Sequence, residues 1–278
     1  MVTDITRSPA EGNAMLLEKK NAVIFAAAGA VGSQLARTFA RERASVYLSG
    51  RRLEPVQALA EKIKAAGGWA QAAQVDALDE RAVEDYVAKV QEKAGALDVG
   101  INAIGISAKL YGQGIALVDL EPKKFMLAPN TFLASQFLTA RALGRRMRDQ
   151  KKGVLLTLST SAGKLNVAFV AGLAAANGAV EAMSRTLACE LGPAGVRVVC
   201  IRPEAMPETD TIKEVFELHG TALGITREQF ADFIAQRTAV KRLPTVAEVA
   251  ETITFLASDR ASALTATVLN LSLGHVVG

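Results

Sequence analysis

Short apolar runs that are rich in β-branched residues alternate along this chain with longer segments of helical period. The runs predict strands at 21–26, 44–49, 68–75, 97–102, 154–159, 196–201 and 266–271. The segments between them predict helices at about 30–41, 53–66, 79–94, 121–150, 173–191 and 246–257. Strands that alternate with helices form βαβ units, whose right-handed crossovers produce a parallel sheet. We therefore expect an α/β fold: a single doubly wound domain with a seven-stranded, mostly parallel sheet and helices on both faces.

The composition supports one compact domain and excludes several kinds of partner. Half of the 278 residues are apolar and 22% are charged, which is enough for one large core. The formal net charge of +4 gives no reason to expect a nucleic-acid partner. Two cysteines and two histidines, without the spacing of metal ligands, predict no metal site.

The first residues of the chain differ from the rest in character. We expect residues 1–19 to be a polar N-terminal extension and residues 20–278 to be the domain. The extension lacks the apolar core of a signal peptide, and no apolar run reaches membrane-spanning length. These features predict a cytoplasmic protein without a membrane partner.

Two segments interrupt the alternation of strands and helices. Residues 105–119 follow the fourth strand, and residues 203–243 follow the sixth. In an open α/β sheet, ligands bind outside the carboxyl ends of the strands, which is where both segments begin. We expect them to be the walls of a pocket for a small-molecule substrate.

The turn after the first strand consists of small residues. It reads Phe25-Ala26-Ala27-Ala28-Gly29-Ala30-Val31-Gly32. Small residues let the backbone and the N-terminus of the next helix approach a pyrophosphate. The second strand ends at Arg51 and Arg52, where an acidic residue would hold a free ribose 2′-hydroxyl. Two arginines suit a 2′-phosphate instead, so this pair favours NADP(H).

Further markers follow in order along the chain. They are Val75-Asp76-Ala77, the segment 98–105, Leu158-Ser159-Thr160-Ser161-Ala162-Gly163 and the segment 187–198. Over about residues 17–275 this ordered set resembles the short-chain dehydrogenase/reductase superfamily. The tract 203–244 resembles a divergent bacterial branch similar to 3-oxoacyl-carrier-protein reductases. The resemblance implies a Rossmann fold, NADP(H) as cofactor, and a homodimer or homotetramer.

The resemblance also assigns cofactor-binding residues. They are Gly29 and Gly32 at the phosphate turn, Arg51 and Arg52 at the 2′-phosphate, Asp76 near the adenine, and Asn102 in the strand beside the cofactor. Ala26 and Ala30 stand where the family shows glycines. A methyl group at Ala26 costs conformational freedom if the turn needs a positive φ, and one at Ala30 is placed to crowd the pyrophosphate. We therefore expect a weakened phosphate turn.

The residues that carry the usual chemistry of this family are missing. In the family, a tyrosine protonates the substrate oxygen, a lysine four residues later lowers the pKa of the tyrosine, and an upstream serine binds the same oxygen. The resemblance places Thr160 at the serine, Leu173 at the tyrosine and Asn177 at the lysine. Thr160 can still orient an oxygen, but Leu173 has no proton to give and Asn177 has no charge. Residues 165–184 contain neither Tyr nor Lys, so no shift of register restores the pair.

Other side chains are candidates for the missing acid. We single out Tyr111 on the 105–119 segment and His219 on the 203–243 segment, because a histidine titrates near neutral pH. Further polar groups expected near the same edge are Lys109, Ser161, Lys164, Glu204, Glu208 and Asp210.

Three functions stay open at this point. The first is an NADP(H)-dependent oxidoreductase with a non-standard active site, acting on a small carbonyl, imine or enone-like substrate. The second is a non-redox enzyme in the same pocket, catalysing a cyclisation, isomerisation, dehydration or addition. The third is a non-catalytic NADP(H)-sensing or scaffold protein.

Overall fold

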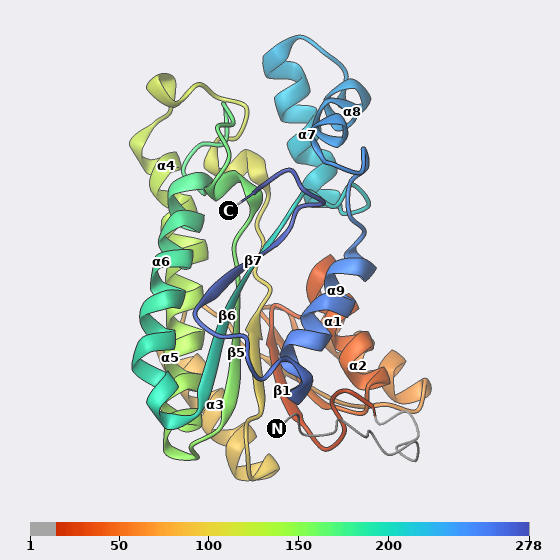
Figure 1. Ribbon diagram of the computed structural model, residues 1–278, viewed down its shortest axis with the longest axis vertical. Coiled ribbons are helices and arrows are strands. Elements are labelled where there is room, and N and C mark those ends of the chain that lie inside the picture. Colours follow the sequence, from red (N-terminus) through yellow and green to blue (C-terminus); the bar gives the residue numbers. More distant parts are fainter. Residues whose placement is uncertain (1–14, 278) are drawn as a thin grey trace, which may run out of the picture.

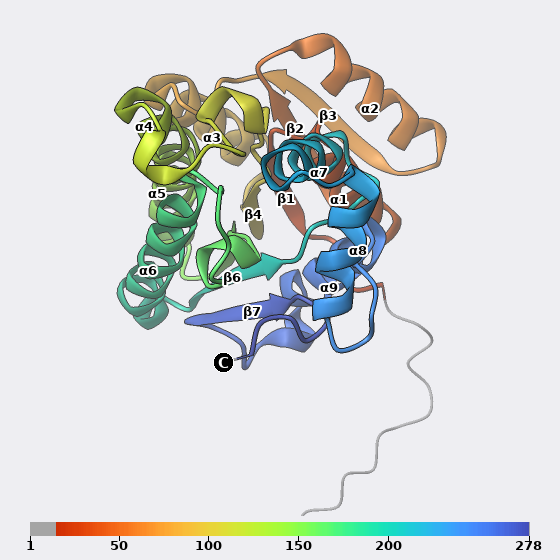
Figure 2. The ribbon, with the colours of Figure 1, turned by 90° about the horizontal axis from the view of Figure 1, so that it is seen from above.

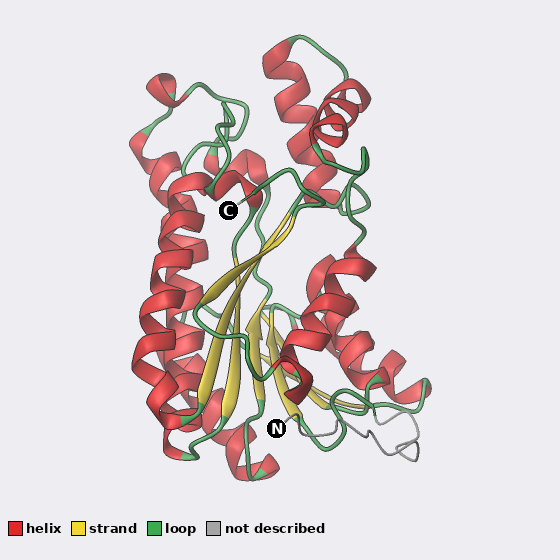
Figure 3. Ribbon diagram, in the orientation of Figure 1, coloured by secondary structure: helices red, strands yellow, loops and turns green. Residues whose placement is uncertain are grey.

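The computed structural model describes residues 15–277, and its strands form one sheet (Figure 1, Figure 3). The strands are β1 (Asn21–Phe25), β2 (Ser45–Gly50), β3 (Trp69–Gln74), β4 (Val99–Asn102), β5 (Gly153–Leu158), β6 (Val196–Pro203) and β7 (Thr267–Leu271). Their order is β3-β2-β1-β4-β5-β6-β7, and every neighbouring pair is parallel. The expected fold class is confirmed, and the sheet is parallel throughout.

Helices cover both faces of this sheet. They are α1 (Ala30–Arg41), α2 (Leu53–Ala65), α3 (Glu80–Ala94), α4 (Pro122–Ala128), α5 (Ala134–Asp149), α6 (Leu173–Leu191), α7 (Asp210–Leu223), α8 (Arg227–Arg237) and α9 (Val246–Ala257). One face packs against α1, α2 and α9, and the other against α3, α5 and α6 (Figure 1). Successive strand residues alternate between these cores, so Ile24 packs in the first and Phe25 in the second.

The sheet has a topological switch point between β1 and β4. The chain runs outward from β1 to β2 and β3, and then returns to place β4 on the other side of β1. Such a point opens a crevice at the carboxyl ends of the strands. In the view from above, α7 and α8 lie on the opposite side of this edge from α4 (Figure 2).

The helix expected at 121–150 is divided into three parts. Helix α4 ends at Ala128, a π-helical turn spans Pro129–Leu133, and α5 begins at Ala134. Pro129 has no N–H and its ring clashes with the preceding turn, so a regular α-helix cannot continue through it. Single π-helical turns are frequent at functional sites, and this one carries Phe132 into the cleft described below.

The polar extension expected at 1–19 is described only in part, because residues 1–14 lie outside the described region. Within the described part, Leu17 is fully buried, and its N–H donates to Glu42 O at 3.1 Å. The packing of the domain therefore begins a few residues before β1. Among residues 15–277, no helix combines the length and the apolar character needed to cross a membrane.

The turn between β1 and α1 passes through Ala26, whose φ is 54°. This left-handed conformation costs an L-residue about 1–2 kcal/mol, and glycine avoids the cost. The methyl group of Ala26 therefore strains the turn. Gly32 is needed for packing, because a Cβ there would lie 2.7 Å from Ala26 O and 2.9 Å from Ala27 Cα. The turn thus has a glycine where α1 approaches closely, and it carries Ala26 where a glycine would relieve backbone strain.

A buried ion pair fixes α6 on β6. Arg202 Nε donates to Glu181 Oε1 at 2.7 Å, and the two side chains are 5% and 8% exposed. Ser159 Oγ donates to the same carboxylate at 2.9 Å. Burial alone would raise the pKa of Glu181, but the hydrogen bonds from Arg202 and Ser159 outweigh burial and hold it below its ordinary value. Glu181 lies one helical turn after Asn177, so this pair positions the part of α6 that faces the site.

Replacing Ala26 with glycine is expected to stabilise the protein by about 0.5–1 kcal/mol, because relief of the left-handed strain exceeds the added entropy of the unfolded chain. Ala58→Gly, in the exposed part of α2, is the matched control and should destabilise by about 1 kcal/mol. Urea unfolding measures both values. Equal destabilisation by the two substitutions would contradict the assignment of strain to Ala26.

Glu181→Ala should lower the free energy of unfolding by about 3–5 kcal/mol, because it leaves the Arg202 guanidinium buried without its partner. Glu61→Ala, which breaks the exposed pair with Lys64 on α2, is the control and should cost less than about 1 kcal/mol. Since the pKa of Glu181 is lowered in the folded state, its contribution is present at neutral pH and is lost as the pH falls through that value. Similar losses of unfolding free energy for the two substitutions at neutral pH would contradict the role of the Glu181–Arg202 pair in holding α6 on β6.

Candidate active site

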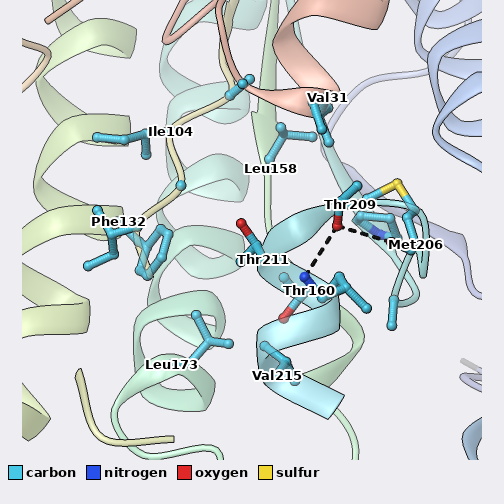
Figure 4. Close-up of a pocket in the computed structure, with 18 of the residues that line it drawn as sticks. Val31, Ile104, Phe132, Leu158, Thr160, Leu173, Met206, Thr209, Thr211 and Val215 are labelled. Atoms are coloured by element: carbon cyan, nitrogen blue, oxygen red, sulfur yellow. Dashed lines mark hydrogen bonds between the residues drawn. The ribbon is translucent and has the colours of Figure 1, made fainter. Parts of the chain in front are cut away.

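A cleft of about 810 Å³ opens at the carboxyl edge of the sheet, and both insertions contribute to its walls. Its lining begins at the turn after β1 and extends past β4 and β5 to α6, α7 and α8. In Figure 4, Val31 of α1 lies at one end, and Leu173 of α6 and Val215 of α7 lie at the other. The cleft therefore runs across the switch point of the sheet, under the segments expected to form its walls.

The two insertions are joined to each other above the sheet. Glu214 of α7 accepts hydrogen bonds from Ser107 Oγ at 2.8 Å and from the backbone N–H of Ala108 at 2.6 Å. Gly114 lies so close to Leu218 that a Cβ would be 3.0 Å from the Leu218 carbonyl oxygen. One carboxylate thus holds the 105–119 segment against α7.

The end of the cleft beside β1 has the features of an anion site. Gly29 and Ala30 line it, and α1 begins at Ala30 with Gly29 as its N-cap. No side chain caps this helix, so its first backbone N–H groups are available to an anion. Gly32 does not line the cleft and acts through the close packing of α1.

Two cationic side chains follow β2 at this same end. Arg51 and Arg52 are exposed and line the cleft. Neither guanidinium has an ion pair or a hydrogen bond with another residue in 15–277. Asp76, after β3, also lines the cleft, and its Oδ1 accepts from the Leu78 N–H at 3.0 Å. The charges here suit a ligand that carries a phosphate near Arg51 and Arg52.

Asn102 lies behind the cleft and does not line it. It is 2% exposed, its Oδ1 accepts from the Ile104 N–H at 3.0 Å, and its carbonyl oxygen accepts from Gln136 Nε2 at 2.9 Å. These bonds hold the end of β4 against α5, and Ile104 itself lines the cleft. Asn102 therefore supports the wall of the site from within β4.

Thr160, Leu173 and Asn177 meet on one wall of the cleft, where Figure 4 labels the first two. Asn177 Nδ2 donates to Thr160 Oγ1 at 3.0 Å and to the Leu173 carbonyl oxygen at 3.0 Å. Since the amide nitrogen of Asn177 only donates, Thr160 Oγ1 is the acceptor in this bond. The O–H of Thr160 therefore remains free to donate to an oxygen in the cleft. Leu173 is 8% exposed and makes the adjoining surface apolar.

Tyr111 and His219 are joined through Gln113. Gln113 Nε2 donates to Tyr111 Oη at 3.1 Å, and Gln113 Oε1 lies 3.2 Å from His219 Nε2. Since an amide oxygen only accepts, His219 carries a hydrogen on Nε2. The Tyr111 ring also packs edge-on against Phe132, with ring centroids 5.8 Å apart. All four side chains line the cleft.

Burial keeps both of these candidate acids neutral. It lowers the pKa of His219 to about 4, because Phe230 and neighbouring apolar groups exclude water from the ring. At pH 7, only about one molecule in a thousand would have this side chain as the imidazolium cation. Burial also raises the pKa of Tyr111 above its ordinary value, and Glu214 adds to the shift. Tyr111 and His219 are therefore suited to hydrogen bonding with a substrate and are poor proton donors at neutral pH.

Three further side chains form a polar cluster that lines the cleft: Ser161, Glu204 and His275. Ser161 Oγ donates to Glu204 Oε1 at 2.7 Å, and His275 Nδ1 lies 2.8 Å from Glu204 Oε2. The side chains of Glu204 and His275 are only 5% and 7% exposed. The sequence-based prediction included Ser161 and Glu204 at this edge but not His275. Its position just after the last strand, in a chain with two histidines, was the available signal.

Comparison with known proteins gives the same family across the whole domain. A family model described as enoyl-(acyl carrier protein) reductase matches residues 26–275. The short-chain reductase protein NovJ of Streptomyces niveus is 30% identical over 256 residues, covering 91% of this chain and 93% of that protein.

Two solved structures show the same fold with cofactors bound. Actinorhodin polyketide ketoreductase with NADPH matches with a TM-score of 0.83 at 25% identity, over 92% of this chain and 98% of that chain. NAD⁺-bound xylitol dehydrogenase matches with a TM-score of 0.86 at 22% identity, over 92% of this chain and 98% of that chain. Similar folds therefore hold either dinucleotide. With a family model that spans nearly the whole domain, this chain belongs to the short-chain dehydrogenase/reductase superfamily.

Proposed function

We propose that this protein is an NADP(H)-dependent oxidoreductase with a non-standard active site, and that it acts on a small carbonyl, imine or enone-like substrate. The observation that carries the proposal is the position of Arg51 and Arg52, two guanidinium groups without partners among the described residues, at the mouth of the cleft. When bound, the reduced nicotinamide would supply a hydride to the substrate carbon. The oxidoreductases of the same family support this chemistry.

The residues of the cleft fit such a cofactor. The N–H groups at the start of α1 would hold the pyrophosphate, Arg51 and Arg52 the 2′-phosphate, and Asp76 the adenine end. The methyl group of Ala30 would stand close to a bound pyrophosphate and Ala26 strains the turn, so the phosphate turn would bind less tightly than one with glycines.

The rest of the cleft indicates the kind of substrate. Most of the lining beyond Thr160 is apolar and comes from Phe132, Leu165, Val167, Val170, Leu173, Val215 and Phe230. An anionic substrate would lose its hydration there without a cationic partner, because Glu204 is the charged group that lines this part of the cleft, so a neutral and largely apolar molecule fits best. The free O–H of Thr160 would bind the oxygen of this molecule and polarise its double bond.

The proposal includes the loss of the usual acid. Leu173 would stand at the position of the family's tyrosine and Asn177 at that of its lysine, with Asn177 orienting Thr160 in place of a charge. Tyr111 and His219 would then serve substrate binding, because burial keeps both neutral.

We also propose a homodimer or homotetramer, as the family resemblance implies. Two surfaces support this. The edge strand β7 is half-buried along its whole length, and Phe137 on α5 is 44% exposed. Apolar surface of this kind is suited to contact with a second copy.

Titration with NADPH and NADH, followed by nicotinamide fluorescence, tests the cofactor. The wild type should bind NADPH about ten- to a hundredfold more tightly than NADH, because guanidinium–phosphate contacts contribute about 1.5–3 kcal/mol. Arg51→Ala should lose most of this preference while binding NADH as before. Arg81→Ala on the surface of α3, whose side chain is 92% exposed, is the control and should change neither affinity.

Two outcomes would count against the proposal. Equal affinity for the two dinucleotides would remove the assignment of Arg51 and Arg52 to a 2′-phosphate. Absence of binding to either would favour the non-redox alternative, in which the same cleft catalyses a cyclisation, isomerisation, dehydration or addition.

A further inference from the structure

The cluster of Ser161, Glu204 and His275 is assembled from three neighbouring strands. Ser161 follows β5, Glu204 follows β6 and His275 follows β7, and these strands lie side by side in the sheet. Because the strands are parallel, the residues that follow them emerge at the same edge. The cluster therefore belongs to the architecture of the cleft, although Glu204 and His275 are 71 residues apart in the chain.

Each member of the cluster is held in place by a specific contact. The carboxylate of Glu204 accepts from Ser161 Oγ at 2.7 Å and from the Ala205 N–H at 3.1 Å, both through Oε1. Its other oxygen faces His275 Nδ1 at 2.8 Å. His275 itself sits in a tight turn, in which its N–H donates to Ser272 O at 3.0 Å. The imidazole and the carboxylate thus have a defined relative orientation.

This orientation leaves one ring nitrogen of His275 available. A carboxylate only accepts, so His275 carries a hydrogen on Nδ1, and the neutral ring has its lone pair on Nε2. Within residues 15–277, Nε2 has no hydrogen-bond partner, and His275 lines the cleft. Ser161 is the chain neighbour of Thr160, so the free O–H of Thr160 and the cluster lie at the same part of the edge.

The other titratable groups around this cluster are engaged elsewhere. Arg202, at the end of β6, is paired with Glu181 of α6. His219, on α7, is buried and bonded to Gln113. Glu204 is therefore the charged group that faces His275, and the pair forms the one carboxylate–imidazole contact among the described residues that line the cleft.

We propose that His275 is the catalytic acid and base of this active site and that Glu204 is the residue that positions it. The inference rests on the proposed oxidoreductase function and supplies the proton that Leu173 cannot. In the reductive direction, the Nε2–H bond of the imidazolium breaks and an O–H bond forms on the substrate oxygen, while the substrate carbon receives the hydride. The imidazole is left neutral and regains its proton from water, and in the oxidative direction each transfer is reversed.

Nuclear magnetic resonance of the histidine ring nitrogens tests the arrangement without any substrate. The chain has two histidines, so the spectrum of the ¹⁵N-labelled full-length protein contains two imidazoles, which His275→Gln assigns. We expect the neutral form of His275 to carry its hydrogen on Nδ1, and its Nε2 signal to move when NADPH is added. Glu204→Leu should shift this ring towards the Nε2–H form, whereas Ser161→Ala, which leaves the Glu204–His275 contact intact, should retain the wild-type form.

The same samples separate this inference from the proposed function. If NADPH binds by fluorescence and the His275 signals do not respond, or if the wild-type ring carries its hydrogen on Nε2, the role of His275 is overturned while the cofactor assignment stands. If NADPH does not bind, the oxidoreductase proposal fails whatever form His275 adopts.

Turnover with 2-tetralone, a neutral bicyclic ketone, and NADPH tests the proton transfer itself. His275→Gln should lower kcat about a hundredfold or more with little change in KM, because general acid–base catalysis contributes about 10²–10⁴ in rate. Imidazole added to His275→Gly should restore part of the lost rate, which a purely structural role would not allow. Glu217→Gln, which alters an exposed carboxylate on α7 outside the cleft, is the control and should leave kcat unchanged. Unchanged kcat in His275→Gln would overturn the proposal.

Discussion

Parallel pairing of the seven strands is the constraint on which the site depends. In a parallel sheet every strand delivers the following segment to the same edge, whatever the distance along the chain. The turn at Ala26, the arginines after β2, Thr160 after β5, Glu204 after β6 and His275 after β7 all reach this edge in that way. The switch point between β1 and β4 leaves a crevice there, and the two insertions enclose it.

Within that crevice, Asn177 of α6 contributes hydrogen bonds and no charge. Asn177 is 3% exposed and uses both amide hydrogens inside the protein, so it fills its position without a charge that would need a partner. A buried ammonium would require a counter-ion or a bound ligand to offset its desolvation. Leu173 beside it is apolar, and Tyr111 and His219 are neutral. Glu204 lines this region and pairs with His275, so we assign proton transfer to this pair.

Much of the fold and part of the site could be predicted from the sequence. The seven strands, the cleft walls at 105–119 and 203–243, and the shared position of Thr160 and Leu173 follow from local patterns and from the family resemblance. The prediction of one helix at 121–150 was wrong at its centre, although the proline at position 129 indicates a break there. The helical period of this segment predicts one continuous helix, but Pro129 has no N–H with which to continue the α-helical hydrogen bonds.

The remaining features depend on contacts between distant segments. By residue type alone, His219 is expected to gain and lose a proton near neutral pH. Its pKa is lower than that because burial, to which Phe230 of α8 contributes, disfavours the charged ring. The bond between Glu204 and His275 joins the ends of β6 and β7, and no local pattern indicates that the two side chains meet. The buried position of Asn102, the last residue of β4, likewise involves a distant partner, because its carbonyl oxygen accepts from Gln136 of α5. Tertiary burial and long-range pairing set these properties.

A crystal structure of the full-length protein with NADPH tests the central claim most directly, since it shows whether one cleft unites the cofactor, Thr160 and the Glu204–His275 pair. Our account predicts the 2′-phosphate within hydrogen-bond distance of Arg51 or Arg52. It also predicts the nicotinamide ring in the part of the cleft lined by Thr160, Leu173 and His275. A nicotinamide ring bound away from Thr160 and His275, or a 2′-phosphate held by other residues, would contradict it.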